Sequence, residues 1–169
     1  VRSRDGLSEP DIQYHIAHAS FANPAKRIFD PFPGLTIGPC QLHPESRGEV
    51  HITSGDPMAA PIIRPNYLAT DEDARVHVAS MKIARAIMAS PAIAPIVESE
   101  TRPGIETASD DELLAYARET GVTLYHPVST CRMGPVPANG DVVDAGLRVH
   151  GCRGLRVVDA SIMPELISG

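Results

Sequence analysis

The chain has 169 residues, of which 43% are hydrophobic and 21% are charged, a composition typical of a folded globular protein rather than a disordered one. Its net charge of −6 argues against a surface for nucleic acid or anionic membranes, and no apolar run is long enough for a transmembrane helix. The three cysteines, Cys40, Cys131 and Cys152, contain no Cys-x-x-Cys pair and predict neither a disulfide framework nor a zinc site.

The first part of the chain predicts short strands separated by turns. Alternating apolar residues indicate strands at 11–16, 35–42 and 48–53. In the third of these strands we expect Val50 and Ile52 to point inward. Three prolines in 20–34 predict a loop, and three more in 57–66 predict an extended and irregular segment.

A long helix is predicted at 71–89, where polar capping residues precede an apolar periodicity. Thr70 is the expected N-cap, and Asp73 occupies the capping-box position three residues later. The apolar face that should pack on the core consists of Val76, Ala79, Ile83 and Ile87.

A second helix is predicted at 110–120, and short strands should follow it. Ser109 caps this helix, Glu112 completes a capping box, and Gly121 marks its C-terminal end. The expected strands are 122–125, 142–143, 147–149 and 155–158. The succession predicts an α+β fold in which a mainly antiparallel sheet carries a few packed helices.

Most residues that could carry chemistry have a simpler structural explanation. His15 and His18 are three apart in a stretch with a strand-like pattern, and residues three apart on a strand face opposite sides, so they would not share a metal ion. The sequence contains no Gly-x-Ser-x-Gly elbow, no Gly-x-Gly-x-x-Gly fingerprint and no P-loop. It therefore offers no recognisable site for a nucleotide phosphate.

His126 is the strongest single candidate for a catalytic side chain. It stands before Pro127, which holds the preceding residue extended and fixes the direction of the imidazole. A fixed imidazole beside a serine or threonine could act as a general base near neutral pH. The alternative is a structural histidine that hydrogen-bonds a loop carbonyl, and spacing alone favours that alternative.

Six segments of the chain together carry a resemblance to a known family. They are residues 40–50, 65–68, 125–134, 142–144, 147–151 and 154–164. In order and spacing they resemble the C-terminal region of the glucose–methanol–choline (GMC) flavin oxidoreductases, most of all the choline dehydrogenase and bacterial alcohol dehydrogenase branch. The ordered set is specific, whereas the His-Pro pair alone is not.

The resemblance implies an enzyme that binds FAD and oxidises a small alcohol. Hydride would pass from the alcohol carbon to flavin N5, while a histidine accepts the hydroxyl proton. The matching histidine is His126, so the resemblance makes it the general base. Tyr125 matches a position that lines the flavin pocket, and Asp159 and Ala160 match the strand that meets the ribityl and phosphate part of the cofactor. No metal is implied.

The resemblance also implies that the chain is truncated at both ends. Residues 1–120 would form most of a substrate-binding domain, and residues 121–169 would carry the catalytic histidine back towards an FAD domain that the chain lacks. A second catalytic residue would follow Leu166–Gly169, as residue 170. Alone, the chain should be inactive, and its uncovered apolar surface should favour homo-oligomers or aggregation.

Two rival interpretations of the function stay open. The first is a non-catalytic scaffold or binding module without flavin, which a flavin titration would separate from an enzyme. The second is a cofactor-free hydrolase that uses His126 and a serine, but the sequence offers no acid or oxyanion hole for it. The first residues do not form a signal peptide, which predicts a cytoplasmic protein.

Overall fold

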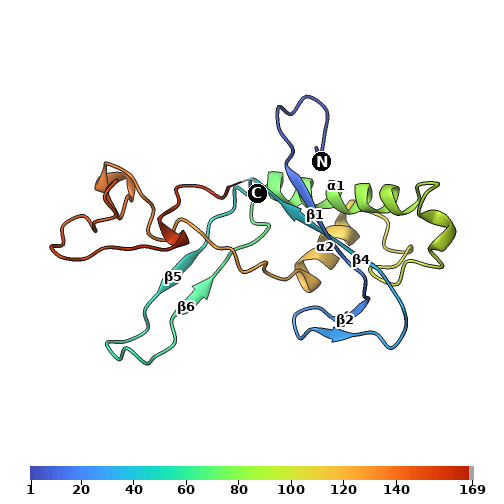
Figure 1. Cartoon of the computed structure of the whole chain (residues 1–169), viewed down its shortest axis with the longest axis horizontal. Coiled ribbons are helices and arrows are strands. Elements are labelled where there is room, and N and C mark those ends of the chain that lie inside the picture. Colours follow the sequence, from blue (N-terminus) through green and yellow to red (C-terminus); the bar gives the residue numbers. More distant parts are fainter. Residues whose placement is uncertain (168–169) are drawn as a thin grey trace. The chain divides into compact units, whose positions relative to one another are not determined.

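The computed structural model describes residues 1–167, so the predicted turn of Leu166–Gly169 lies partly outside the described residues. The protein is α+β, and its chain divides into two compact units (Figure 1). Unit 1 comprises Val1–Glu45 and Leu68–Val122, and unit 2 comprises Ser46–Tyr67 and Thr123–Gly169.

The elements of unit 1 are β1 (Ile12–Ala17), β2 (Phe21–Asn23), β3 (Ile28–Phe29), β4 (Thr36–Gln41), α1 (Asp71–Met88), the 3-10 helix η1 (Ala94–Ile96) and α2 (Asp110–Thr120). Those of unit 2 are β5 (Glu49–His51), β6 (Ile62–Arg64) and the 3-10 helices η2 (Pro137–Asn139) and η3 (Ala160–Ile162). The named strands pair antiparallel, as predicted, but in three separate two-stranded sheets.

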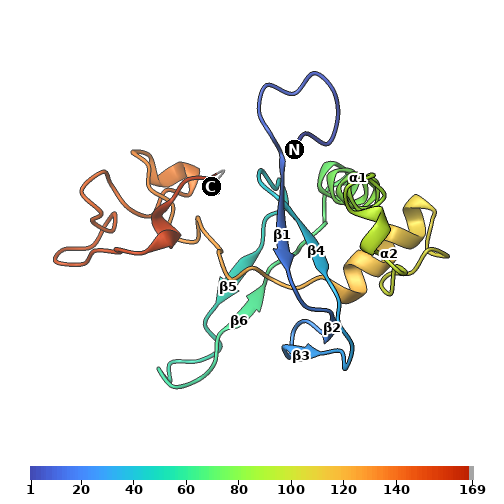
Figure 2. The ribbon, with the colours of Figure 1, turned by 45° about the vertical axis from the view of Figure 1, so that its right-hand side comes forward.

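In unit 1 the main sheet pairs β1 with β4 and lies beside the two α-helices (Figure 2). Its register runs from Ile12 opposite Gln41 to Ala17 opposite Thr36. The predicted strands 11–16 and 35–42 are therefore confirmed. The predicted loop 20–34 is wrong in part, because it contains β2 and β3, whose Phe21 and Phe29 rings lie 4.9 Å apart.

Helix α1 is confirmed, with Thr70 accepting the Asp73 backbone N–H at its N-cap. The face that it buries differs from the predicted apolar stripe: the buried positions are Asp73, Val76, Val78, Ser80 and Ala84. Two of these residues are polar, and both have hydrogen-bond partners. Asp73 Oδ1 accepts from the Gln41 side chain and from the Glu45 backbone, each at 2.8 Å. A buried carboxylate is tolerated where it has such donors, so α1 can turn Asp73 towards the core. Apolar periodicity alone does not predict a buried polar position of this kind.

Helix α2 is confirmed together with its complete capping box between Ser109 and Glu112. Leu113 and Ala117 are its buried residues, and Leu113 is fully buried. Gly121 ends the helix, but not through a left-handed conformation, since its φ is −58°. A Cβ at this position would lie 2.5 Å from the Ala117 carbonyl oxygen, so close approach of the backbone is what requires glycine.

In unit 2, β5 and β6 form a two-stranded ribbon that places Val50 opposite Ile63. The strand predicted at 48–53 is confirmed, but the inward direction of Val50 and Ile52 is wrong, because they are 49% and 87% exposed. A ribbon of two strands has no second layer of its own to cover its apolar side chains. The segment 57–66, predicted to be irregular, contains β6.

The C-terminal part of unit 2 is held by isolated bridges rather than by regular strands. Val143 bridges both Met133 and Val149, and it is fully buried. The predicted strands 142–143, 147–149 and 155–158 are reduced to such bridges. The strand predicted at 122–125 is absent from the described chain, because Tyr125 has a left-handed backbone with φ of 61°. Across the described residues, no helix has both the length and the apolar character to cross a membrane.

Candidate active site

His126 lies on an exposed loop of unit 2 between two backbone restraints. On its C-terminal side Pro127 limits it to extended conformations. On its N-terminal side Tyr125 is left-handed, and its backbone N–H donates to Thr123 Oγ1 at 3.0 Å. The imidazole is exposed and has no hydrogen-bond or ion-pair partner within residues 1–167. The structural alternative, a histidine that bonds a loop carbonyl, is therefore not what the described chain contains.

The same Thr123 hydroxyl also accepts a hydrogen bond from Tyr67, which follows strand β6. The Tyr67 Oη atom lies 3.0 Å from Thr123 Oγ1. Tyr67 is preceded by Asn66, another left-handed residue, whose side-chain amide donates to the Arg47 carbonyl at 3.0 Å. The base of the β5–β6 ribbon is thus joined to the loop of His126.

On the other side of His126, the loop is joined to the segment around η3. The Ser129 hydroxyl contacts the carbonyl oxygens of Met163 and Pro164, at 2.8 and 3.0 Å. Two backbone bonds continue this pairing, from Cys131 N to Ser161 O at 2.9 Å and from Met133 N to Ile162 O at 2.8 Å. The pairing brings the loop of His126 and the segment that follows Asp159 into one assembly.

A buried carboxylate supports the far end of this assembly. Asp141 accepts from the Val136 backbone N–H at 3.0 Å and from Arg132 Nε at 2.9 Å. The Val136 bond, followed by the Arg132 guanidinium, lowers the pKa of Asp141 against the opposing effect of desolvation. Gly134 packs against this carboxylate so closely that a Cβ would lie 2.1 Å from Asp141 Oδ2.

Asp159 and Ala160 stand at the beginning of η3, and their roles in the structure differ. Asp159 Oδ1 accepts the Ser161 backbone N–H at 2.8 Å and also the Ser161 hydroxyl, and these two bonds lower the pKa of Asp159. Its carboxylate is therefore already engaged in capping. The Ala160 N–H, in contrast, has no acceptor in the part of the chain that the structure describes, so it is available to a bound group.

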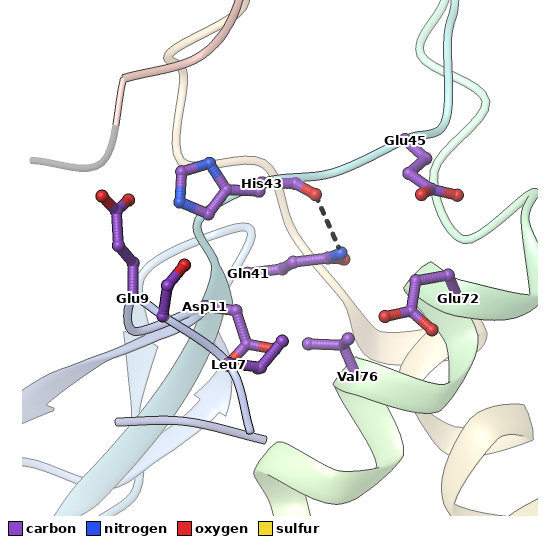
Figure 3. Close-up of a pocket in the computed structure, with 9 residues that line it drawn as sticks. Leu7, Glu9, Asp11, Gln41, His43, Glu45, Glu72 and Val76 are labelled. Atoms are coloured by element: carbon purple, nitrogen blue, oxygen red, sulfur yellow. Dashed lines mark hydrogen bonds between the residues drawn. The ribbon is translucent and has the colours of Figure 1, made fainter. Parts of the chain in front are cut away.

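A separate hollow of about 370 Å³ lies in unit 1 and contains none of the predicted site residues. Figure 3 shows Glu9, Asp11, Glu45 and Glu72 around it, with the Gln41 side chain donating to the His43 carbonyl at 3.3 Å. No group of three or more histidine, cysteine or acidic residues in residues 1–167 is arranged to hold a metal ion. The candidate site is therefore the loop assembly of unit 2.

Comparison with known proteins identifies the class to which this assembly belongs. The family description "GMC oxidoreductase" matches residues 44–169, and the chain belongs to this family of FAD-dependent oxidoreductases. Two relatives place it near alcohol- and choline-oxidising members. An alcohol dehydrogenase [acceptor] of Pseudomonas putida is 43% identical over the whole chain, and choline oxidase of Arthrobacter globiformis is 41% identical over 98% of it. The chain spans 30% and 31% of the lengths of these two proteins.

A solved structure supports the same relationship. Pyridoxine 4-oxidase from Mesorbium loti matches with a TM-score of 0.82 and 34% sequence identity. The match covers 100% of this chain and 33% of that one. The family resemblance read from the sequence is therefore confirmed, as is the α+β fold.

Three residues of the assembly were missed by sequence reasoning as functional candidates: Tyr67, Thr123 and Ser129. Tyr67 lies in the segment 65–68 that resembles the family, which was the available signal. Nothing in the sequence marked Thr123 as its partner, because the two residues are 56 positions apart. Ser129 has a left-handed backbone with φ of 71°, a conformation that favours glycine, and no local sequence pattern predicted it at a serine.

Proposed function

We propose that the chain is the C-terminal portion of an FAD-dependent alcohol dehydrogenase or oxidase that acts on choline-like or other small alcohols, with His126 as its general base. The observation that carries the proposal is the exposed imidazole of His126, which is free of partners in the described chain, on a loop bonded to the η3 segment. The membership in the GMC family supplies the chemistry.

The role of His126 follows from its position and its freedom. An unprotonated ring nitrogen would accept the proton of the substrate hydroxyl, which raises electron density on the carbinol carbon and eases departure of hydride. Bound FAD would supply the acceptor for that hydride at N5. Pro127 and the left-handed Tyr125 would keep the imidazole directed at the substrate rather than turned along the loop.

Of the two residues predicted to contact the cofactor near η3, Ala160 has an N–H that is free within the described residues and suits a flavin, whereas the Asp159 carboxylate is already engaged within the chain. The open N–H of Ala160 is suited to donate to a flavin oxygen. The Asp159 carboxylate accepts the backbone N–H of Ser161. We therefore propose that Asp159 fixes the turn that presents the Ala160 N–H, besides any contact of its own with the cofactor. The exposed ring of Tyr125 is proposed to line the flavin pocket.

The domain assignment is part of the same proposal. Residues 1–120 would belong to the substrate-binding domain, and residues 121–169 would return towards an FAD domain contributed by additional sequence. The change between compact units at Val122 and Thr123 lies beside this boundary, which supports it. The β5–β6 ribbon, however, belongs to the same unit as His126, so it too is proposed to border the site.

The test is a His126→Ala variant of the full-length gene product, purified with its flavin. Anaerobic mixing with choline and with aliphatic and benzylic alcohols should reduce the flavin of the native protein. In the variant, the rate of flavin reduction should fall by roughly 10²–10⁴-fold, the range typical of a lost acid–base group, with flavin content unchanged. His18→Ala is the matched control, because His18 is an exposed histidine of unit 1 and belongs to neither the loop of His126 nor the β5–β6 ribbon.

The outcomes separate the alternatives. Near-native flavin reduction in His126→Ala would refute the assignment of the base. A full-length protein that retains no visible flavin absorbance after incubation with FAD and desalting would favour the scaffold interpretation. Hydrolysis of an ester without flavin, lost in His126→Ala, would favour the hydrolase. The 169-residue chain alone is expected to retain no flavin.

A further inference from the structure

We propose that Tyr67 is a positioning residue for the His126 base, acting through the hydroxyl of Thr123. This inference rests on the proposed function. The connection is short: Tyr67 Oη donates to Thr123 Oγ1, and Thr123 Oγ1 also accepts the backbone N–H of Tyr125, with both distances at 3.0 Å. Tyr125 directly precedes His126 in the chain.

Tyr125 has a backbone conformation that requires stabilisation by its surroundings. Tyr125 has φ of 61°, a left-handed conformation that is unfavourable for a residue with a Cβ. Its N–H bond to Thr123 holds this conformation, and the Tyr67 bond in turn holds the Thr123 hydroxyl in the rotamer that accepts it. Without the Tyr67 hydroxyl, Oγ1 can rotate towards water, and Tyr125 can relax to the extended region.

Relaxation at Tyr125 would redirect His126. Pro127 already confines His126 to extended backbone conformations, so the direction of the imidazole depends on the residue before it. A change of φ from the left-handed to the extended region at Tyr125 would swing the imidazole away from its native direction. A base displaced from the substrate hydroxyl loses rate even though its chemistry is unchanged.

Tyr67 can hold Thr123 because its own backbone is fixed. It follows Pro65 and the left-handed Asn66, and Asn66 is anchored by its bond to the Arg47 carbonyl. Across the same ribbon, a Cβ on Gly48 would lie 2.3 Å from the Arg64 carbonyl oxygen, so the two strands approach closely at its base. The hydroxyl is thus presented from a constrained turn rather than from a free loop.

The exposure of Tyr67 determines how large a loss of rate we expect when its hydroxyl is removed. Tyr67 is 62% exposed in this chain, so water competes for its hydroxyl and the bond is of ordinary strength. We therefore expect Tyr67→Phe to lower the rate of flavin reduction by about 3–10-fold, well short of the loss in His126→Ala.

The experiment compares four variants of the full-length flavoprotein: Tyr67→Phe, Thr123→Val, Thr123→Ser and the double variant Tyr67→Phe/Thr123→Val. Both single losses of the hydroxyl should lower the rate constant of flavin reduction, leave the KM for the alcohol unchanged, and lower the plateau of the pH profile rather than move its midpoint. Thr123→Ser should retain most of the rate, and the double variant should be no slower than the slower single variant.

Two further measurements distinguish positioning from general damage. Amide hydrogen exchange should rise in the peptide that contains Tyr125 in the Tyr67→Phe variant, a readout that does not depend on turnover. Tyr14→Phe is the matched control, because it also removes a tyrosine hydroxyl bond, from Tyr14 Oη to the Ser80 carbonyl at 2.7 Å in unit 1. This control should reduce flavin at the native rate.

Each remaining outcome has a definite meaning. Native-like reduction and exchange in Tyr67→Phe, multiplicative losses in the double variant, or an equal loss in Tyr14→Phe would overturn the positioning role. If Thr123→Val fails to fold, Tyr67→Phe and its exchange pattern decide alone. Retained turnover in His126→Ala would instead overturn the proposed function, whereas an inactive His126→Ala beside a fully active Tyr67→Phe would overturn only the positioning role.

Discussion

The Ser129 hydroxyl lies 2.8 Å from the Met163 carbonyl oxygen, a contact that joins the loop of His126 to the chain that follows η3. Ser129 is also left-handed, with φ of 71°. Ser129 therefore affects the stability of the fold in two opposite ways. Its left-handed backbone is unfavourable for a residue with a Cβ, whereas its hydroxyl stabilises the contact between two segments. Substitutions at Ser129 can separate these effects.

We predict that Ser129→Ala is less stable than Ser129→Gly. Alanine keeps the same left-handed backbone as serine, so its one change is the lost hydrogen bond, which should destabilise the protein by about 1 kcal/mol. Glycine loses the same bond but relieves a left-handed backbone that costs roughly 1–2 kcal/mol, so its net change should be close to zero.

The midpoint of urea unfolding of the full-length protein measures this order. Ser161→Ala serves as a comparison, because it removes a hydroxyl in the same assembly without any left-handed backbone. If the alanine variant at 129 were as stable as the glycine variant, the backbone at this position would not be strained, contrary to the prediction.

A second prediction concerns acid stability and the buried Asp141. Its side chain is only 8% exposed, and the bonds from Val136 and Arg132 lower its pKa below the ordinary 3.8. A carboxyl whose pKa is lower in the folded state than in the unfolded state stabilises the fold above the unfolded pKa. This contribution is lost as the pH falls through the folded pKa.

We therefore expect Asp141→Asn to be destabilised at pH 7 and to lose less additional stability than the native protein when the pH falls below about 4. Asp5→Asn is the control, since Asp5 has no hydrogen bond or ion pair in residues 1–167. Chemical unfolding at pH 7 and at several acidic values provides the comparison. Parallel loss of stability in Asp141→Asn and the native protein would contradict the assignment.

The sequence predicted those elements whose determinants are local. Both α-helices follow from caps within three residues of their first turns, at Thr70 and Ser109. Strands β2 and β3 depend on the contact between Phe21 and Phe29, which no local pattern encodes. The strand expected at 122–125 ends against the left-handed backbone of Tyr125, whose N–H donates to Thr123 two residues earlier, and Thr123 in turn accepts from the distant Tyr67.

The candidate site was predictable to a similar extent. His126 could be assigned by resemblance because its motif is contiguous in the chain. Its support from Tyr67 and Ser129 could not, because these bonds span 56 and 34 or more positions and involve hydroxyl groups whose usual interpretation is a turn or a surface. Sequence reasoning therefore found the residue that we propose as the base and missed the hydroxyl groups that bond its loop to other segments.

The last prediction concerns the exposed apolar side chains of unit 2. Val143 is its one buried apolar residue among those described, whereas Val50, Ile52 and Ile63 of the β5–β6 ribbon are 49%, 87% and 65% exposed. Val50 and Ile63 are directly opposed across the ribbon, so they form a contiguous apolar surface rather than scattered residues. Contiguous exposed apolar surface favours association in water.

We expect the 169-residue chain by itself to sediment as oligomers or larger aggregates, and the double variant Val50→Thr/Ile63→Thr to shift it towards the monomer. Threonine retains the β-branch suited to a strand while reducing apolar area. Ile96→Thr is the matched control, because Ile96 is 82% exposed but lies in η1 of unit 1, away from the ribbon in sequence. A native chain that sediments as a clean monomer would contradict the prediction. An equal shift in the control variant would mean that association arises from general hydrophobicity rather than from the ribbon.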